Sequence, residues 1–444
     1  MEQQLTAHII DWNQEGRGVA RVNGKAVFIE DALPGEVVQW QSVREKKSYT
    51  EGKISKLLRV AAARVQPPCV YYGRCGGCNS QHIEFTTQVA LKQRAWMNQM
   101  RRLGKVQPDE LMAPIYGLPW RYRERVRLRA VYQAGRLKLG FQARHSHNIV
   151  DIDECMVLSE VLSEALKPIK TLLQSWPEGS VSGVMLHQGN EVNALTLQAS
   201  AINHNQRKQI DSLLLQLQQQ TGKLWQWWLQ TGRTTALQTA KHMYKLSYHL
   251  PEFQTVIPYQ PEDFTQVNQL TNALMVQRAI QWLQPQAGER IIDWFCGLGN
   301  FSLPIARMQA EVVGVEGMAA MCRRASANAQ YNGLKHLAHF QQADLFAMNG
   351  QRLRKFGYAH KWLLDPPRAG AQALILALNE LEERFLPKRI VYVSCDPATL
   401  ARDAGLLVKR GYQYRAGGIM NLFAQTAHLE SRQCLTDECS LSFG

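Results

Sequence analysis

Residues 290–304 read RIIDWFCGLGNFSLP, and this stretch says most about how the chain folds. Its apolar first part, residues 290–294, is typical of a buried strand, and its last residues predict the start of a helix. Gly297 and Gly299 lie between them and allow a tight turn that brings the backbone close to a ligand. Strand, glycine turn and helix together predict the repeating unit of a doubly wound α/β sheet.

The same alternation continues toward the end of the chain. Short apolar runs at residues 311–315, 362–365 and 390–393 alternate with helical patterns, which predicts a mostly parallel sheet. Residues 394–403, SCDPATLARD, follow the last run, so Cys395 lies where a parallel strand ends. Active sites collect at that edge of open α/β sheets. The Cys395 thiol is therefore either an exposed nucleophile or a small packed residue, and the function depends on which.

Length and charge limit the possible classes of protein. A chain of 444 residues is expected to form two or three domains. The 51 Lys and Arg against 37 Asp and Glu give a net charge of +14, which favours nucleic acid as partner, with a merely basic enzyme as the alternative. The sequence contains no signal-peptide pattern and no apolar run of about 18 residues, so we expect a cytoplasmic protein with no membrane partner.

The N-terminal 60 residues are rich in predicted strands. Asn23-Gly24 between apolar segments indicates a hairpin, and short strands at this spacing suggest a small barrel that binds oligonucleotides. The order GRGVA at 16–20, VFI at 27–29 and ALPGE at 32–36 resembles the TRAM module, an RNA-binding barrel of OB-like type. We therefore assign residues 1–60 to a TRAM domain rather than to a generic β domain.

A cysteine cluster follows, in a central α+β domain predicted to span residues 61–258. Cys69, Cys75 and Cys78 have the spacing C-x5-C-x2-C, and the glycines between them let the backbone wrap tightly around a metal centre. Cys155 is the best candidate in this domain for a fourth ligand. Four thiolates fit a closed, non-catalytic [4Fe–4S] cluster, and a tetrahedral zinc site is the alternative.

Five arginines in the same domain occupy alternate positions. On a strand, alternate residues share one face at about 6.6 Å spacing. Guanidinium groups in such a row repel one another unless an anion neutralises them, and they suit phosphate oxygens. We therefore expect RNA contact, with a solvated strand face as the alternative. The five residues are Arg121, Arg123, Arg125, Arg127 and Arg129.

The glycine turn has the features of a nucleoside site. Glu316 ends the next predicted strand about 20 residues further on, where a carboxylate can accept both ribose hydroxyls. A dinucleotide site would use the same elements. The missing third glycine and the presence of Asp344, which is placed to bind an adenine amino group, favour S-adenosylmethionine instead.

The remaining motifs suggest the chemistry. Residues 364–370, LDPPRAG, end a further strand, and Asp-Pro-Pro loops in methyltransferases present an acid to a planar base. C5 of uracil is a poor nucleophile until a thiolate adds at C6, which Cys395 can provide. A base must then remove the C5 proton, and Glu430 in HLE at 428–430 is the candidate. Cytosine C5 methylation uses similar chemistry and is the alternative.

Six stretches together resemble the RNA uracil-5-methyltransferase family, and most of all its 23S ribosomal RNA branch with a TRAM domain and an iron–sulfur cluster. They lie at 67–78, 263–268, 293–304, 365–370, 394–403 and 426–430. The resemblance implies a Rossmann-like methyltransferase domain, residues 259–444, with Cys395 as nucleophile, Glu430 as base and Asp365 at the uracil edge. It implies S-adenosylmethionine contacts at Gln266, Phe295, Asn300, Glu316, Asp344 and Asp365. It also implies cluster ligands Cys69, Cys75, Cys78 and Cys155.

The resemblance further implies a substrate, a uridine of 23S ribosomal RNA that is single-stranded or flipped out, with uridine 1939 favoured by the barrel. Another 23S or tRNA uridine and a non-catalytic RNA-binding protein are the alternatives. We expect a monomer. Two residues depart from the Asp-x-Phe-Pro pattern of the family, because the chain has Asn421 and Ala424 there. Loss of the proline is expected to loosen the loop before Glu430, and loss of the aspartate removes a charge near the active site.

Overall fold

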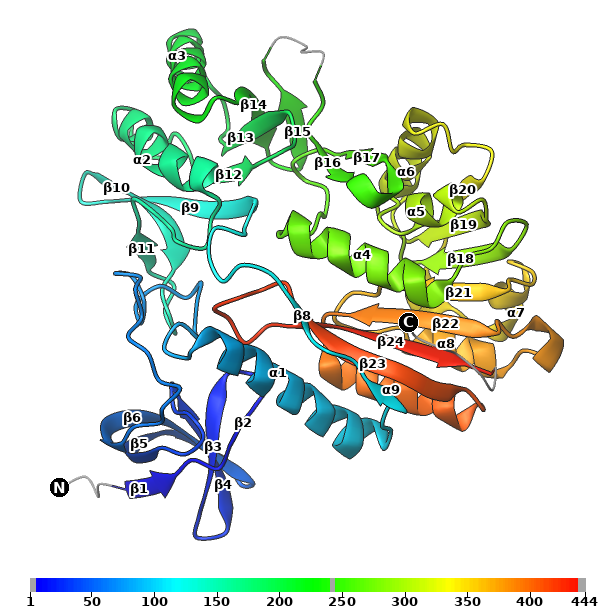
Figure 1. Ribbon diagram of the computed structural model, residues 1–444. Coiled ribbons are helices and arrows are strands. Elements are labelled where there is room, and N and C mark those ends of the chain that lie inside the picture. The colour runs from blue at the N-terminus through cyan, green and yellow to red at the C-terminus, as the bar shows by residue number, and fades with distance from the viewer. Residues whose placement is uncertain (1–4, 240–243, 438–444) are drawn as a thin grey trace.

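A computed structural model describes residues 5–239 and 244–437 of the protein (Figure 1). The N-terminal part is a six-stranded sheet in the order β1-β5-β6-β4-β3-β2. Its strands are β1 (Leu5–His8), β2 (Asp11–Trp12), β3 (Arg17–Val22), β4 (Lys25–Glu30), β5 (Val37–Glu45) and β6 (Tyr49–Arg59). The Ile10 amide donates to the Val19 carbonyl at 2.8 Å, so the chain after β1 meets β3 and the sheet curls around its small apolar core.

The central part is a seven-stranded sheet in the order β11-β10-β9-β12-β13-β14-β15, antiparallel except for the β13–β14 pair. Two helices, α2 and α3, pack on one face and bury its apolar side chains. The elements are β9 (Arg125–Gln133), β10 (Arg136–Gln142), β11 (Ile149–Asp151), α2 (Glu160–Gln174), β12 (Gly183–His187), β13 (Val192–Gln198), α3 (His204–Thr221), β14 (Leu224–Thr231) and β15 (Thr234–Leu237). The other face adds Val192, Ala194 and Trp228 to the core of the C-terminal part.

The C-terminal part contains the large sheet, in the order β20-β19-β18-β21-β22-β24-β23-β7, with β8 also paired to β23. All its recorded pairings are parallel except those of β24, which runs antiparallel to β22 and β23. The strands are β7 (Glu110–Leu111), β8 (Ile115–Tyr116), β18 (Arg290–Trp294), β19 (Glu311–Glu316), β20 (Ala338–Gln342), β21 (Lys361–Leu364), β22 (Arg389–Ser394), β23 (Gln413–Asn421) and β24 (Glu430–Thr436).

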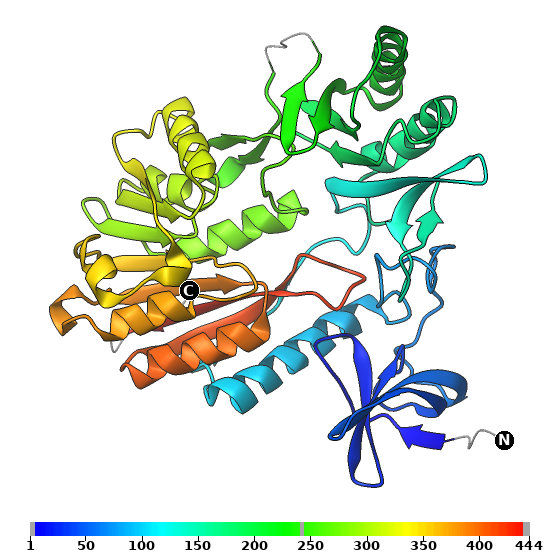
Figure 2. The ribbon, with the colours of Figure 1, turned by 180° about the vertical axis from the view of Figure 1, so that it is seen from behind.

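Helices cover both faces of this sheet, as the alternating sequence pattern predicted (Figures 1 and 2). One core lies under α4, α5 and α6, and the other under α1, α7, α8 and α9. The helices are α1 (Phe85–Gln99), α4 (Gln269–Leu283), α5 (Ser302–Arg307), α6 (Ala319–Tyr331), α7 (Gly350–Arg354), α8 (Gln372–Asn379) and α9 (Pro397–Lys409). A two-stranded sheet, β16 (Ser247–Leu250) and β17 (Thr255–Pro258), packs beside α4.

Residues 85–116 pack with the large C-terminal sheet and not with the central domain. Residues 85–116 were assigned to the central domain, yet α1 packs in the core of the large sheet, and β7 and β8 pair with β23. Trp96 and Met100 are fully buried there, so burial of these apolar side chains places the segment. Within the described residues, no helix has both the length and the apolar character needed to cross a membrane.

Candidate active site

Cys395, Asp365 and Glu430 meet at one edge of the large sheet, as predicted. Asp365 follows the last residue of β21, and Cys395 follows the last residue of β22, its parallel neighbour. Ser394 pairs with Ser431 across β22 and β24, so Cys395 and Glu430 occupy the next positions of that antiparallel register. The carboxyl ends of the parallel strands β21 and β22 and the start of the antiparallel strand β24 therefore bring together three residues that are far apart in sequence.

The backbone around Cys395 is fixed by the start of α9. Asp396 caps this helix, because its Oδ1 accepts the amides of Ala398 at 2.9 Å and Thr399 at 3.0 Å. Pro397 occupies the first helical position, where its missing amide costs nothing. The cap fixes the turn on which Cys395 lies, and its partly buried thiol remains reachable from the sheet edge.

The three side chains alter one another's acidity. Burial raises the pKa of the Cys395 thiol to about 12; Glu430 and Asp365 add to this rise and Arg368 opposes it. Burial raises the pKa of Asp365 to about 7. Burial, followed by the Asp365 charge, raises the pKa of Glu430 well above its usual value, and Arg368 again opposes. At neutral pH Cys395 is therefore held as a thiol. Arg368 is the cation that lowers the pKa of both Cys395 and Glu430.

The predicted glycine turn lies at the same sheet edge, after β18. Gly297 and Gly299 have φ values of 53° and 91°, which a side chain would strain. The Gly297 amide donates to Glu316 Oε2 at 3.2 Å, and the Met318 amide donates to Glu316 Oε1 at 3.1 Å. Glu316, the carboxylate expected to bind a ribose, therefore links the glycine turn after β18 to the end of β19.

Asn300 sits within a side-chain network that local sequence did not reveal. Its Oδ1 accepts from the Tyr248 hydroxyl at 3.0 Å and from Asn272 Nδ2 at 3.1 Å, and its Nδ2 donates to Asn272 Oδ1 at 3.0 Å. Tyr248 and Asn272 come from β16 and α4, so only the tertiary fold brings them to the turn. The network holds the Asn300 amide in one orientation.

Two other predicted cofactor residues follow the ends of β18 and β20, and a third lies before α4. Phe295 adopts a left-handed φ of 66° and contacts Phe346, with ring centroids 5.8 Å apart. Asp344 follows β20, and its Oδ1 accepts the amides of Phe346 at 3.0 Å and Ala347 at 3.2 Å. Gln266 is buried in the segment that leads into α4. The edges of β18, β19 and β20 thus bring together an aromatic pair and two carboxylates, the groups that an adenosine needs.

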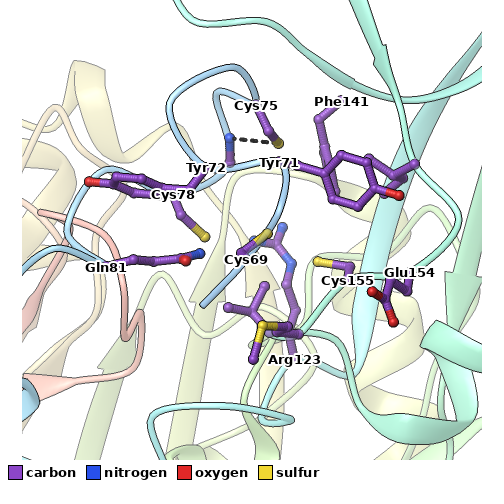
Figure 3. A pocket seen from close by; sticks show the side chains of 14 residues that line it. Cys69, Tyr71, Tyr72, Cys75, Cys78, Gln81, Arg123, Phe141, Glu154 and Cys155 are labelled. Atoms are coloured by element: carbon purple, nitrogen blue, oxygen red, sulfur yellow. Dashed lines mark hydrogen bonds between the residues drawn. The ribbon is translucent and has the colours of Figure 1, made fainter. Parts of the chain in front are cut away.

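The four cysteines of the central part line one cavity (Figure 3). Cys69, Cys75 and Cys78 lie on one loop, and Cys155 reaches the cavity from the segment before α2. The Gly77 amide points at Cys75 Sγ over 3.4 Å. The structure therefore groups the four predicted ligands around a common space and supplies a backbone amide to one sulfur.

The described residues do not form a ready-made site for a single metal ion. Around a single zinc ion, Zn–S bonds of about 2.3 Å hold the sulfurs close together. No three Cys, His, Asp or Glu side chains within residues 5–239 and 244–437 form a group that could hold one metal ion. The metal centre expected at Cys69, Cys75, Cys78 and Cys155 therefore stays a prediction.

The row of arginines is shorter than predicted. β9 begins at Arg125, so only Arg125, Arg127 and Arg129 share its face, while Arg121 and Arg123 precede the strand. Arg121 has a positive φ of 57°, which turns the chain just before the strand; Arg123 lines the cysteine cavity instead. The Arg125 guanidinium binds the Asp263 carbonyl at 2.6 Å, so this arginine links the central sheet to the segment before α4. Arg127 and Arg129 remain exposed.

Comparison with known proteins agrees with this geometry. The family model "tRNA (Uracil-5-)-methyltransferase" matches residues 231–438, and the TRAM domain model matches residues 3–53. A Neisseria lactamica protein named 23S rRNA (uracil(1939)-C(5))-methyltransferase RlmD is 44% identical over 430 residues, which cover 96% of this chain and 94% of the relative. A protein of the same name from Nitrosospira multiformis is 44% identical over 94% of this chain and 95% of its own length.

A solved structure shares the whole architecture. It is a Pyrococcus abyssi tRNA (uracil-54, C5)-methyltransferase in complex with S-adenosyl-L-homocysteine, with a TM-score of 0.72 and 22% identity over 97% of this chain and 100% of that one. At this identity the likeness concerns the fold. The fold, the residues at the sheet edge and the full-length relatives agree, and the chain belongs to the RNA uracil-5-methyltransferase family.

Proposed function

We propose that this protein transfers a methyl group from S-adenosyl-L-methionine to C5 of uridine 1939 in 23S ribosomal RNA. The observation that carries the proposal is the meeting of Cys395, Asp365 and Glu430 at one sheet edge, next to the glycine turn. The Neisseria and Nitrosospira relatives are named for this reaction and align with nearly the whole chain, which supports the choice of substrate.

Cys395 begins the proposed reaction. Its Sγ bonds to C6 of uracil, the C5–C6 double bond opens, and the electron pair passes toward the C4 carbonyl as an enolate. Asp365, whose pKa lies at about 7, can be protonated and stabilise that oxygen by a hydrogen bond. When bound, S-adenosyl-L-methionine would supply the methyl group to C5 and leave as S-adenosyl-L-homocysteine. Because the free protein holds Cys395 as a thiol, its proton must pass to a base as the RNA binds, and the Asp365 carboxylate, which then donates to the C4 oxygen, is the candidate.

Glu430 completes the reaction by taking the C5 proton. The electrons of that C–H bond then restore the C5–C6 double bond, and the Cys395 thiolate leaves C6. Burial and Asp365 raise the pKa of Glu430, and a carboxylate with a raised pKa is a stronger proton acceptor. The place of Glu430 beside Cys395 in the strand register suits a base that acts on the same ring.

The glycine turn and its neighbours would hold S-adenosyl-L-methionine. Glu316 and Asp344 would accept from the ribose and the adenine, Phe295 would pack on the adenine, and Gln266 and Asn300 would hold the amino-acid end. The target uridine must be single-stranded or flipped out, because a stacked base does not expose C6. An enzyme acting on 23S ribosomal RNA would work in the cytoplasm, and we propose a monomer.

Arg127 and Arg129 supply part of the proposed RNA surface, because both are exposed on one face of β9. Changing both to Gln should reduce the slope of log affinity against log salt by about 1.4, at about 0.7 per lost phosphate contact with single-stranded RNA. Binding of a 23S fragment measured from low to high salt tests this. Arg384→Gln is the control. Arg384 lies in the short helical turn Glu383–Phe385 before β22 of the large sheet, and its loss should not change the slope. An unchanged slope in the double variant would remove β9 from the RNA surface.

We also propose that Cys69, Cys75, Cys78 and Cys155 hold a [4Fe–4S] cluster. The four side chains line one cavity, and the Gly77 amide donates to Cys75 Sγ at 3.4 Å, as backbone amides do at cluster sulfurs. With all four iron corners bound to cysteine, the cluster would have no open iron and would act on the fold rather than in the chemistry. The loop from Cys69 to Cys78 and the segment around Cys155 would be tied together by it.

Protein purified without oxygen should be brown and contain about four irons per chain, as expected for a cluster with four cysteine ligands. Cys155→Ser should lose most of the iron and of the visible absorbance. Cys322→Ser, which changes a buried cysteine on α6, should keep both. Stoichiometric zinc in a colourless protein would contradict the iron–sulfur proposal and leave the methyltransferase proposal intact.

The proposed function is tested by labelled methyl transfer to large-subunit RNA, followed by digestion to nucleosides. We expect 5-methyluridine as the product. Recovery of 5-methylcytidine would instead indicate cytosine chemistry, and RNA binding without any methyl transfer would indicate a non-catalytic protein.

A further inference from the structure

A buried lysine fastens the hairpin that carries Glu430. Lys92 lies on α1, more than three hundred residues from this hairpin in sequence, and its side chain is fully buried. Its Nζ donates to Asn421 Oδ1 at 2.6 Å, to the Phe423 carbonyl at 3.0 Å and to the His428 carbonyl at 2.8 Å. One ammonium group therefore bridges the end of β23 and the residues just before β24.

These contacts require the charged form of the side chain. An ammonium has three N–H donors, whereas a neutral amine has two, and three oxygens surround Nζ. Burial lowers the pKa of Lys92 to about 7, so surrounding acceptors must favour the ammonium if it is to stay charged. The hairpin supplies those acceptors, and the lysine and the hairpin stabilise each other.

The tip of the loop has its own, separate supports. Gln88, also on α1, exchanges hydrogen bonds with Gln425, and the Tyr122 hydroxyl donates to the Ala424 carbonyl at 2.8 Å. The Ala427 amide donates to Asn79 Oδ1 at 2.9 Å. Lys92 differs from these because it binds both arms at the base of the loop, where Met420 pairs with Glu430.

Asn421 occupies a place that suits a carboxylate. Its Oδ1 accepts from Lys92, and its buried Nδ2 has no hydrogen-bond partner within the described residues. An aspartate there would give Lys92 a counter-charge and would leave no donor unpaired. Lys92 is thus the only charged partner in this contact, and loss of its charge leaves one of the three oxygens without a donor.

We propose that Lys92 is a positioning residue that sets the Glu430 carboxylate over the target ring by clamping the two arms of the β23–β24 hairpin. The inference rests on the proposed function, because it assigns Lys92 to the proton-removal step rather than to thiol attack. Cys395 lies on the turn after β22, which Asp396 fixes separately, so loss of Lys92 should leave attack intact.

The test follows a single turnover with labelled RNA and S-adenosyl-L-methionine. The covalent protein–RNA species survives denaturation, so its rise and decay can be measured separately. In Lys92→Met, the rise should stay within about threefold of wild type, while the decay slows about 10- to 100-fold, the scale of a misplaced catalytic group. Asn421→Leu, which removes one acceptor, should slow the decay in the same direction but less.

Leu217→Ala is the control, because it creates a cavity under α3 in the core of the central part, which contains no residue of the hairpin. In this variant, the rates at which the covalent protein–RNA species forms and decays should keep the wild-type ratio. Decay at the wild-type rate in Lys92→Met, or an equal loss of rise and decay there, would overturn the inference. If wild-type protein forms no adduct and transfers no methyl group, the proposed function fails instead, so the two failures are distinguishable.

Discussion

Replacing Cys395 with alanine should abolish methyl transfer to RNA. The expected loss is on the order of 10⁶-fold, the scale seen when other covalent enzymes lose their nucleophile. Without the thiolate, C5 of uracil has no enolate to attack the methyl group, and no other cysteine follows β22 at this sheet edge within the described residues. Transfer of labelled methyl groups to large-subunit RNA measures the effect.

Two further measurements show whether the loss of activity is specific to the Cys395 thiol. Cys434→Ala removes a buried cysteine from β24 and should keep nearly full activity, which separates the loss of this thiol from the loss of any thiol. Cys395→Ala should still bind RNA and S-adenosyl-L-methionine, because neither the glycine turn nor β9 changes. A Cys395→Ala protein that methylates RNA at the wild-type rate would rule out the covalent route.

Replacing Glu430 with glutamine should stop the reaction after methyl transfer. The amide cannot accept the C5 proton, so release should slow by about 10² to 10⁴-fold, the usual contribution of a general base. The change also removes a negative charge that raises the pKa of Cys395, so thiol attack should be no slower than in wild type. A methylated, covalently bound RNA should therefore accumulate.

The covalent species is measured by denaturing electrophoresis of labelled RNA with the protein. Glu311→Gln, an exposed change at the start of β19, should show the small steady-state amount of wild type. If Glu430→Gln turns over at the wild-type rate, another group removes the C5 proton. If it forms no adduct at all, Glu430 acts on attack rather than on release.

Much of the fold and the site could be predicted because both have local signals. The run 290–304 indicated a strand, a turn and a helix, and Gly297 and Gly299 do take the positive φ values that the turn requires. Cys395 was placed at the end of a parallel strand by apolar residues alone. The sheet order then brings Asp365 and Glu430 beside it, as the family resemblance implied.

Other features had no local signal. Alternation predicted one strand face for five arginines, but periodicity does not tell where a strand begins, and the positive φ of Arg121 turns the chain beforehand. The segment 85–116 joins the large sheet through burial of Trp96 and Met100, which is a matter of tertiary packing. Lys92 resembles any helical lysine in sequence, and only the fold shows that its Nζ reaches Asn421.

The structure also shows which contacts Asn421 and Ala424 make, the two residues that depart from the family pattern. We expected that loss of the usual proline would loosen the loop before Glu430 and that loss of the aspartate would remove a charge near the active site. Ala424 is buried, and its carbonyl accepts from Tyr122, while Asn421 still accepts from Lys92. Hydrogen bonds from α1 and from Tyr122 therefore hold the loop that a proline would have stiffened.

The central claim is that Cys395, Asp365 and Glu430 methylate one uridine of 23S ribosomal RNA. The most direct test maps 5-methyluridine along 23S RNA from a strain that lacks this gene, with and without a plasmid carrying the wild-type or the Cys395→Ala protein. We predict that the mark at uridine 1939 disappears, returns with the wild-type protein and does not return with Cys395→Ala. An unchanged mark at uridine 1939 in the deletion strain would contradict the account.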